Sequence, residues 1–416
     1  MSWSCRSVRS RHTAASGVCV LAGLVGLPAG SAAAADTYVQ PRVDLRVENN
    51  DNFYLTPGGS ADSDIYGYIA DAQALIGIAT PRSDTSMRPR VRFQEYPDSD
   101  EMERFEAFFD LRSRYTWERS EFLLLGKYDR QDSHNADQPT AEFDPLDPTD
   151  PANPGSATSL VGETRNRFEI RPEYKHDVTE RVRLGVDGTY EVVRYDSDAV
   201  STNTEYDYAA AGGSVRWKLT PVSGVNFGAY ASKYEARDDS TDTDAYGGEV
   251  GYDYRWSEVT GVEVSVFYEQ NDITNFQPVR SEDSTSGWGG GVTAYRKGEI
   301  SEWRLTAGRT FIPTGDGGKA ESDQFRVQYD RDLRERLSFR GGARYEARTL
   351  RDDGRAGNDR DYARVDLRLE WLLAPTWYIN GGYSYIWQDR ESDSGSADNN
   401  RLFIGFGYRG LKRQSR

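Results

Sequence analysis

The stretch "YGGEVGYDYRW", Tyr246 to Trp256, carries two unlike sets of side chains on alternate positions. One set is aromatic or small, and comprises Tyr246, Gly248, Val250, Tyr252, Tyr254 and Trp256. The other set contains the charged residues Glu249, Asp253 and Arg255. A period of two is typical of a β-strand whose two faces meet different surroundings. The fold therefore depends on what the aromatic face meets.

The same alternation recurs along the chain and predicts an all-β protein of eighteen strands, within a range of 16 to 20. No helical periodicity of useful length lies between these segments. The predicted strands are 38–47, 65–79, 88–96, 105–116, 121–129, 164–174, 181–195, 206–219, 225–235, 245–256, 262–271, 287–297, 302–311, 324–331, 336–348, 362–372, 377–390 and 400–409.

The first 35 residues predict a secretory signal peptide. Arg6, Arg9 and Arg11 precede the apolar stretch "AASGVCVLAGLVGLPAG", and "SAAAAD" supplies a small-residue cleavage site after Ala35. Residues 36–416 then form one domain. The two cysteines, at positions 5 and 19, fall in the removed segment, so the exported chain has to fold without disulfides.

The connections between the predicted strands alternate in length. Short links such as 118–120, 257–261 and 373–376 alternate with long polar ones, of which 130–163 is the longest. Short turns at one end and long loops at the other are typical of outer-membrane barrels. Mean hydropathy is only −0.75 and no later stretch has 18 apolar residues. A transmembrane barrel explains this polarity, because about half of its strand positions face water.

Tryptophan positions separate a soluble core from a membrane protein. A soluble core buries large aromatic side chains in mid-strand, whereas the two interfaces of a bilayer select them at strand ends. We expect none of the eight tryptophans beyond the signal peptide to lie in mid-strand. The predicted membrane-interface residues are Trp117, Trp217, Trp256, Trp303, Trp371 and Trp377 at the short-turn ends, and Trp288 and Trp387 near the long-loop ends. The aromatic face is therefore predicted to face lipid.

Charge is distributed unevenly along the chain. The formal net charge is −16, and it becomes −19 without the signal peptide, which holds three arginines and no acid. The long connections hold 35 acids and eight bases, so the outer surface is predicted to be acidic and the wall mildly basic. This balance excludes a nucleic-acid partner. The expected partners are outer-membrane lipid, lipopolysaccharide and the barrel-assembly machinery of a Gram-negative bacterium.

Many bases fall on the register opposite the aromatic face. The predicted pore-lining residues are Arg112, Arg114, Arg165, Arg167, Arg171, Arg181, Arg183, Arg340, Arg344, Arg348, Arg364 and Arg368. Acids are interleaved with them, so one interpretation is a mixed ladder of ion pairs that keeps a wide lumen wet. The other is an arginine track for a polyanion, because the guanidinium fork matches the geometry of carboxylates.

The connection 130–163 is rich in proline, and the sequence leaves open whether it folds inward as a constriction or covers the mouth as a lid. Two acidic stretches, 238–244 and 142–155, lack the glycine and terminal glutamate of an EF-hand loop. We expect solvated surface there, or metal ions shared with lipopolysaccharide phosphates, and no dedicated metal site.

Catalytic residues are not expected. Beyond the signal peptide only His134 and His176 are histidines, so a Ser–His hydrolase has to use one of them. With two histidines and no cysteine, a zinc site is also not expected. The sequence predicts no enzyme and no cofactor.

At "RVDLRVENNDNFYLTP", residues 42–57, the chain resembles a family of β-barrel porins associated with exopolysaccharide export. In that family a strand that ends in an Asp-Asn pair, here Asp51 and Asn52, opens the barrel. The repeated long polar loops and arginine-rich strands also look like alginate-type exporters. The resemblance implies export of an acidic polysaccharide, together with periplasmic export components.

The C-terminus departs from the usual pattern of outer-membrane barrels. Leu402, Ile404, Phe406 and Tyr408 form an alternating last strand, but "RGLKRQSR" follows it. Either the assembly signal is tolerated internally or assembly is less efficient than usual.

The sequence therefore predicts a transmembrane barrel that conducts a hydrophilic solute, and the preferred solute is a secreted acidic polysaccharide. A general diffusion porin and a structural or adhesive barrel are the alternatives. The identity of the solute, the oligomeric state and the export partners are left open.

Overall fold

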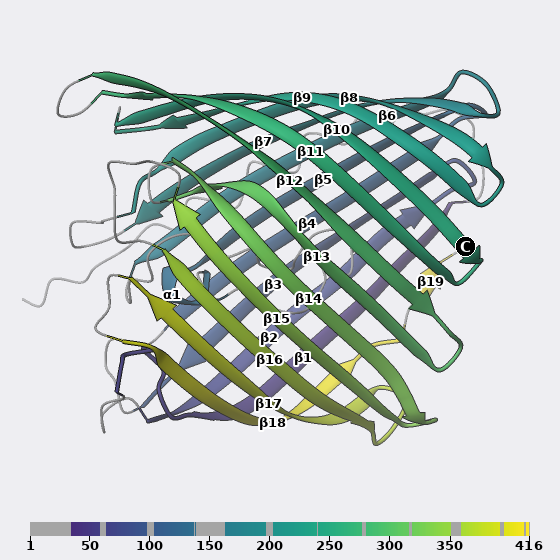
Figure 1. Ribbon diagram of the computed structural model, residues 1–416. Coiled ribbons are helices and arrows are strands. Elements are labelled where there is room, and N and C mark those ends of the chain that lie inside the picture. The colour runs from purple at the N-terminus through teal and green to yellow at the C-terminus, as the bar shows by residue number, and fades with distance from the viewer. Residues whose placement is uncertain are drawn as a thin grey trace, which may run out of the picture.

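A closed ring of antiparallel strands makes up the described part of the chain (Figure 1). The computed structural model describes residues 35–58, 64–97, 104–136, 138, 163–196, 203–238, 240–276, 280–315, 318–350, 359–391, 395–411 and 413–415. Its strands are β1 (Asp36–Asn50), β2 (Ile65–Ala79), β3 (Ser83–Glu95), β4 (Arg104–Thr116), β5 (Ser120–Asp132), β6 (Thr164–Asp177), β7 (Val182–Asp196), β8 (Tyr206–Thr220), β9 (Ser223–Ala236), β10 (Thr241–Ser257), β11 (Thr260–Asn275), β12 (Ser281–Lys297), β13 (Ser301–Thr314), β14 (Gly318–Arg334), β15 (Leu337–Leu350), β16 (Arg360–Leu372), β17 (Trp377–Arg390), β18 (Ala397–Arg409) and the short β19 (Arg413–Ser415).

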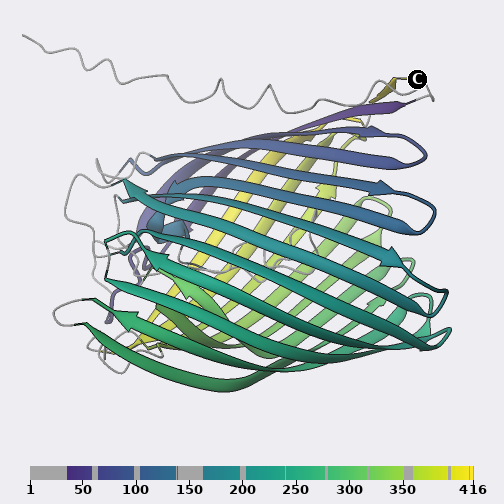
Figure 2. The same ribbon diagram turned by 90° about the horizontal axis from the view of Figure 1, so that it is seen from above.

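Closure of the sheet comes from β1, which pairs with β2 on one edge and with β18 on the other. All other neighbouring long strands are consecutive in sequence, so the barrel is up-and-down (Figure 2). Each of the eighteen predicted segments matches one of β1–β18. The predicted fold class, an 18-stranded antiparallel barrel of the outer-membrane type, is confirmed.

The segment after the last long strand forms part of the barrel seam. β19 pairs with Thr37–Val39 of β1, beyond the stretch of β1 that pairs with β18. Between them, the Gly410 N–H donates to the Pro41 carbonyl at 2.7 Å. A Cβ atom on Gly410 would lie 2.6 Å from the Pro41 ring, so only glycine fits this approach. The sequence predicted no strand here, because three residues are too short to show a period of two.

The two faces of the wall are those that the alternation predicted. Val250, in the middle of β10, is 53% exposed on the outer surface, as are other large apolar side chains around the barrel. Inside, Glu106 and Arg165 are 0% and 1% exposed. This arrangement suits a bilayer, because every strand has hydrogen-bonding partners on both edges at membrane height and the ionic groups avoid hydrocarbon.

The strands extend farther beyond the membrane than the sequence predicted. β10 begins at Thr241, β12 at Ser281 and β14 at Gly318, so the predicted long loops 236–244, 272–286 and 312–323 are mostly strand. Two of the four acids of the stretch 238–244, Asp242 and Asp244, thus belong to β10. The alternation missed these extensions because both of their faces are polar, as in "SEDSTS" at the start of β12.

Trp288 corrects the expectation that no tryptophan lies in mid-strand. It is the eighth residue of the seventeen in β12, and it is 67% exposed on the outer face. Nine positions separate it from Lys297 at the short-turn end. At about 3.3 Å per residue and a tilt of about 40°, these span about 23 Å, close to the height of an outer-membrane apolar band. This span fits the predicted position of Trp288 at the outer interface, and the strand continues past it.

The other seven predicted interface tryptophans lie on strands or at strand ends of the barrel. Trp117, Trp217, Trp256, Trp371 and Trp377 are exposed, whereas Trp303 and Trp387 are half-buried among their neighbours. Trp377 stacks on Phe406 of the neighbouring strand, with ring centroids 5.1 Å apart. Aromatic rings therefore also contact one another across strands near the short-turn end of the barrel.

One short helix, α1 (Ser133–Ala136), follows β5. Among the described residues, no helix is long and apolar enough to cross a membrane. Residues 1–34 of the predicted signal peptide lie outside the described residues. The same is true of the acidic stretch 142–155 and of most of the connection 130–163.

Candidate pore lining and basic pocket

The inner surface of the barrel has two unlike halves. The arginine wall is the inward face of β1–β6 and β14–β18, and the small-residue wall is the inward face of β7–β13. The arginine wall carries ten of the twelve predicted residues: Arg112, Arg114, Arg165, Arg167, Arg171, Arg340, Arg344, Arg348, Arg364 and Arg368. Arg183 lies on the small-residue wall, where it pairs with Asp177 at 2.6 Å. Arg181 lies in the turn before β7 and is exposed, away from the wall.

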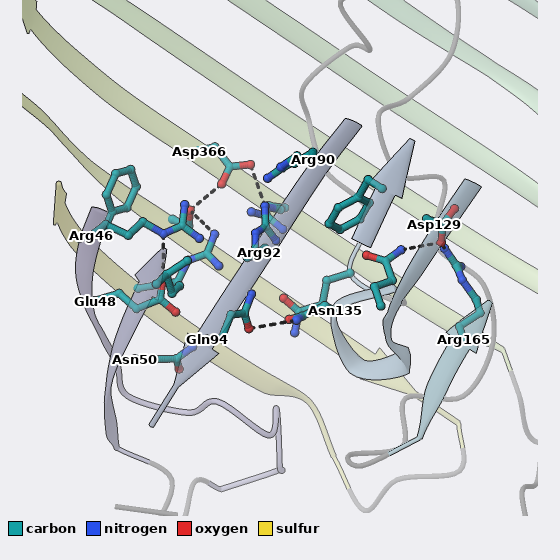
Figure 3. A pocket seen from close by; sticks show the side chains of 18 of the residues that line it. Arg46, Glu48, Asn50, Arg90, Arg92, Gln94, Asp129, Asn135, Arg165 and Asp366 are labelled. Carbon is teal, nitrogen blue, oxygen red and sulfur yellow. Dashed lines mark hydrogen bonds and ion pairs between the residues drawn. The ribbon is translucent and has the colours of Figure 1, made fainter. Parts of the chain in front are cut away.

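A cavity of about 320 Å³, here called the basic pocket, lies against the arginine wall. It forms where the barrel closure brings β1–β6 beside β16–β18, and Figure 3 shows side chains from these strands and from α1 around it. Ten bases and four acids line the pocket: Arg46, Arg88, Arg90, Arg92, Lys127, Arg165, Arg167, Arg364, Arg368 and Arg401 against Glu48, Asp110, Asp129 and Asp366. The lining therefore has an excess of positive charge.

Most of these guanidinium groups are held by carboxylates. Arg90 donates to Asp71 at 2.5–3.0 Å, and Arg92 bridges Asp71 and Glu106 at 3.2 and 3.3 Å. Arg165 pairs with Asp129 at 2.8 Å, and Arg364 pairs with Asp366 at 2.7 Å. These contacts match the predicted mixed ladder of ion pairs. They also fix the side chains in place, because each acid accepts bonds in a set direction.

Arg401 and Arg46 are different. Within the described chain no carboxylate lies within 4 Å of Arg401, whose contact is a 3.3 Å hydrogen bond from Nη2 to Ser384 Oγ. Arg46 approaches Glu48 only to 3.6 Å, beyond hydrogen-bond distance, and lies over the Phe403 ring with its Cζ 5.5 Å from the centroid. The Nε groups of Arg46 and Arg401 are buried without a partner. Arg368 is similar, because its nearest carboxylates, Asp44 and Glu370, lie 3.8 and 4.0 Å away and its Nε is also buried without a partner. Three guanidinium groups of the pocket therefore keep unused donors for an anion.

The outer rim of the pocket consists of two segments that fold into the barrel. One is the inner part of the β1–β2 connection, residues 51–58, here called L1. Its Phe53 packs on Tyr96 with ring centroids 5.0 Å apart, and Leu55 packs with Tyr362, Ile386 and Ala397. Asn52 holds this turn, because its Nδ2 donates to the carbonyls of Thr56 and Asp398 at 3.0 and 2.9 Å. Leu55 has a positive φ of 51°, a conformation that this packing stabilises.

The second segment is α1. Its Asn135 donates to Gln94 at 3.2 Å and to Glu106 at 2.7 Å, so α1 is tied to the inward faces of β3 and β4. Asn135 and Gln138 line the basic pocket. The start of the connection 130–163 therefore folds inward, as one of its two predicted arrangements requires.

His134 joins α1 to L1. The imidazole is 2% exposed and its ring centroid lies 4.8 Å from that of Phe53. Gln138 Nε2 donates to His134 Nε2 at 2.8 Å, which requires a neutral ring. The pKa of His134 is lowered to about 3, mainly by burial and also by the nearby Arg104 cation, against a backbone hydrogen bond to Phe53 that raises it. His134 is thus a structural contact at this rim.

The small-residue wall borders a second cavity of about 490 Å³. Gly185, Gly212 and Gly228 line it from β7, β8 and β9, with Ala210 and Ser214 between them. Because these side chains are short, they leave the space beside them open, whereas long arginine side chains occupy the space beside the arginine wall.

His176 contacts Ser120, the pairing that a Ser–His hydrolase requires. His176 Nδ1 lies 2.8 Å from Ser120 Oγ, and Tyr174 Oη donates to the same oxygen at 3.1 Å. All three share the outward register of β5 and β6, and no carboxylate orients the imidazole within the described residues. The contact lacks the third group of a triad. In the described ranges, no group of three or more His, Cys, Asp or Glu residues is placed to hold a metal ion.

The pocket contains five arginines that the sequence prediction did not select: Arg46, Arg88, Arg90, Arg92 and Arg401. The signal was present in "RPRVRF" of β3, where arginines alternate with Pro89, Val91 and Phe93. Clustering along the sequence favoured other strands, whereas clustering in space depends on closure of the barrel.

A closed barrel with an apolar outer band, aromatic interfaces and an ionic interior defines the class of outer-membrane β-barrels. No protein-family model and no curated protein matches this chain. Solved porin structures do. OccAB3 of Acinetobacter baumannii has a TM-score of 0.44 at 10% identity, covering 90% of this chain and 99% of that one. Pseudomonas aeruginosa OccK2 in complex with glucuronate gives 0.43 at 10%, covering 91% and 99%. OpdK of the same species with vanillate gives 0.43 at 12%, covering 89% and 98%.

A likeness at this level of identity leaves the family and the solute open. Nothing in these comparisons supports the exopolysaccharide association that the resemblance at residues 42–57 implied.

Proposed function

We propose that the protein is a passive channel of the Gram-negative outer membrane for small hydrophilic solutes, with a preference for anions. The observation that carries this proposal is the pair Arg46 and Arg401, whose guanidinium groups line the basic pocket without a hydrogen-bonded carboxylate. Multiple weak contacts of this kind attract an anion without holding it, which transport requires.

The inward position of L1 and α1 favours small solutes over a polymer. An exporter of acidic polysaccharide, as the resemblance implies, needs a wide continuous duct, whereas these two segments occupy the mouth above the basic pocket. A general diffusion porin differs from our proposal only in having no charge preference. The acidic residues of the outer strand ends fit an adhesive or structural barrel, which needs no open lumen.

Planar-bilayer recordings test this proposal. We expect the wild-type channel to favour chloride over potassium in a salt gradient. The variant Arg46→Gln/Arg401→Gln should lower this preference about threefold, because it removes two positive charges that no carboxylate holds by a hydrogen bond. The matched control is Arg183→Gln/Arg340→Gln, which removes two inward bases that pair with Asp177 and Asp330 outside the pocket.

Glucuronate and tri-galacturonate separate the solute classes in the same recordings. Brief current blocks by glucuronate, weakened in the Arg46→Gln/Arg401→Gln variant, support small acidic solutes. Block by tri-galacturonate alone supports polysaccharide export. Equal permeability for both ions supports a general porin, and absence of conductance supports the adhesive barrel.

A further inference from the structure

The wall is interrupted between β12 and β13. Their pairing stops at Gly290 and Arg309. Beyond this point, residues 281–289 of β12 pair with β11 only, and residues 310–314 of β13 pair with β14 only. Figure 1 shows the outer ends of β12 and β13 parting at the left of the view. Because Trp288 marks the outer interface, the interruption lies at and beyond the edge of the membrane, where one edge of β12 has no strand partner in the described chain.

The described outer end of the β13–β14 hairpin, residues 310–315 and 318–322 and here called the tip, lies inside the barrel. Tyr234 Oη donates to the Thr314 carbonyl at 3.0 Å, and the Thr204 N–H donates to the Gly315 carbonyl at 2.6 Å. Lys319 Nζ pairs with Glu269 at 2.7 Å, and both side chains are nearly buried. These contacts dock the tip on the inward faces of β9 and β11, over the outer end of the small-residue wall.

A second position for the tip follows from the register of the wall. If the pairing of Gly290 with Arg309 continued, Trp288 would face Phe311 and Thr285 would face Thr314. The free edge of β12 would then gain a partner. Phe311, whose ring now packs on the inward Phe267 at 5.7 Å, would move to the outer face beside Trp288. The paired position therefore satisfies the free edge of β12, and both positions give the Phe311 side chain an aromatic partner.

Two glycines form the branch point. A Cβ atom on Gly308 would lie 2.5 Å from the Gly290 carbonyl oxygen, and one on Gly290 would lie 2.4 Å from the Ser265 carbonyl oxygen. The backbones of β11, β12 and β13 thus approach more closely here than side chains permit. This approach lets β13 leave β12 without displacing the wall below it.

We propose that the tip is a gate with two positions. In the docked position it narrows the mouth above the small-residue wall, and in the paired position β13 lies along β12 and the mouth is wider. Two discrete packings with different partners are the physical requirement for such a switch. The gate rests on the proposed channel function, and it goes beyond it by assigning control of the open area to residues 310–315 and 318–322.

Engineered disulfides test the two positions directly. Thr204→Cys/Gly315→Cys joins residues that already share a backbone hydrogen bond, and it should lock the docked position. Thr285→Cys/Thr314→Cys joins residues that face each other only in the paired position. The natural cysteines, at positions 5 and 19, lie within the predicted signal peptide and should not interfere.

We expect both disulfides to form under mild oxidation. The paired lock should conduct about threefold more than the docked lock, because the tip no longer covers part of the mouth, and reduction should restore equal conductance. Failure of the Thr285→Cys/Thr314→Cys bond to form, or equal conductance of both oxidised locks, would overturn the gate. Absence of conductance in every reduced variant would instead overturn the channel function.

A variant without engineered cysteines tests the gate independently. Lys319→Met removes the ion pair to Glu269 and should raise the frequency of the high-conductance state about threefold, because only the docked position is weakened. The control Lys233→Met removes a lysine from an exposed ion pair with Glu235 that does not touch the tip. If Lys319→Met and Lys233→Met both show the high-conductance state as often as wild type, the docked contact does not control the channel.

Discussion

The arginine wall and the small-residue wall belong to one sheet and share one lipid-facing outer surface, yet their interiors differ. On β3, inward arginines alternate with apolar residues and are held by Asp71, Glu106 and Asp110. On β8 and β9, the inward positions include the small residues Ala210, Gly212 and Gly228. The first wall supplies fixed charge and fills space. The second supplies open space, so the charge and the width of the lumen are set by different strands.

The largest expected difference between the walls concerns stability. Asp71 holds both Arg90 and Arg92, so Asp71→Asn should lower the free energy of unfolding by about 2 kcal/mol, because two partly buried cations lose their shared acid. Asp253→Asn on the small-residue wall, where one half-exposed Arg216 loses its partner, should cost less than about 1 kcal/mol. Urea unfolding followed by tryptophan fluorescence measures both. Equal losses of unfolding free energy in the two variants would show that the ion pairs of the arginine wall stabilise the protein no more than surface ion pairs do.

Conductance, in contrast to stability, should respond to a change in the small-residue wall. Gly228→Trp projects a large ring into the second cavity, and a Cβ atom there meets only ordinary contacts at 3.7 and 3.8 Å, so the fold should tolerate it. We expect conductance to fall about fivefold, because the open area lies beside this wall. Gly213→Trp is the matched control, because it adds the same ring to the lipid-facing side of β8. An unchanged current in Gly228→Trp would place the solute path elsewhere.

The smallest effect concerns pH at the rim of the arginine wall. Released from L1, His134 would regain an ordinary pKa near 6.5, whereas docked α1 keeps the pKa near 3. Docking is therefore fully stable above about pH 6.5 and weakens as the pH falls toward 3, because the released state binds a proton that the docked state excludes. At pH 6 the release of α1 should be about fourfold more frequent than at pH 7.5.

Hydrogen exchange of the α1 amides measures this release. His134→Gln keeps a polar group in place but does not titrate, so its exchange, corrected for the intrinsic pH effect, should be the same at both pH values. A wild-type protein with the same pH-independent exchange would show that the imidazole does not control docking.

The sequence alone determined which residues form strands and which way they face. In β10, the alternation of Val250 and Tyr252 with Glu249 and Asp253 reports surroundings that each strand meets on its own two sides, so it can be read locally. The tryptophans at the short-turn ends predict a membrane interface for the same reason. The alternation failed to predict the outer ends of β10, β12 and β14. Both faces meet water there, so the side chains of the two faces no longer differ in polarity.

Only the tertiary structure decided which inward residues meet. Arg46, Arg92 and Arg401 are far apart in sequence, and they share one pocket because β1 closes the barrel against β18. The inward folding of L1, α1 and the tip likewise depends on contacts such as Phe53 with His134 and Lys319 with Glu269, between segments that no local pattern relates. Periodicity records the surroundings of a strand, whereas a pocket and a gate are made by the closure that brings distant strands together.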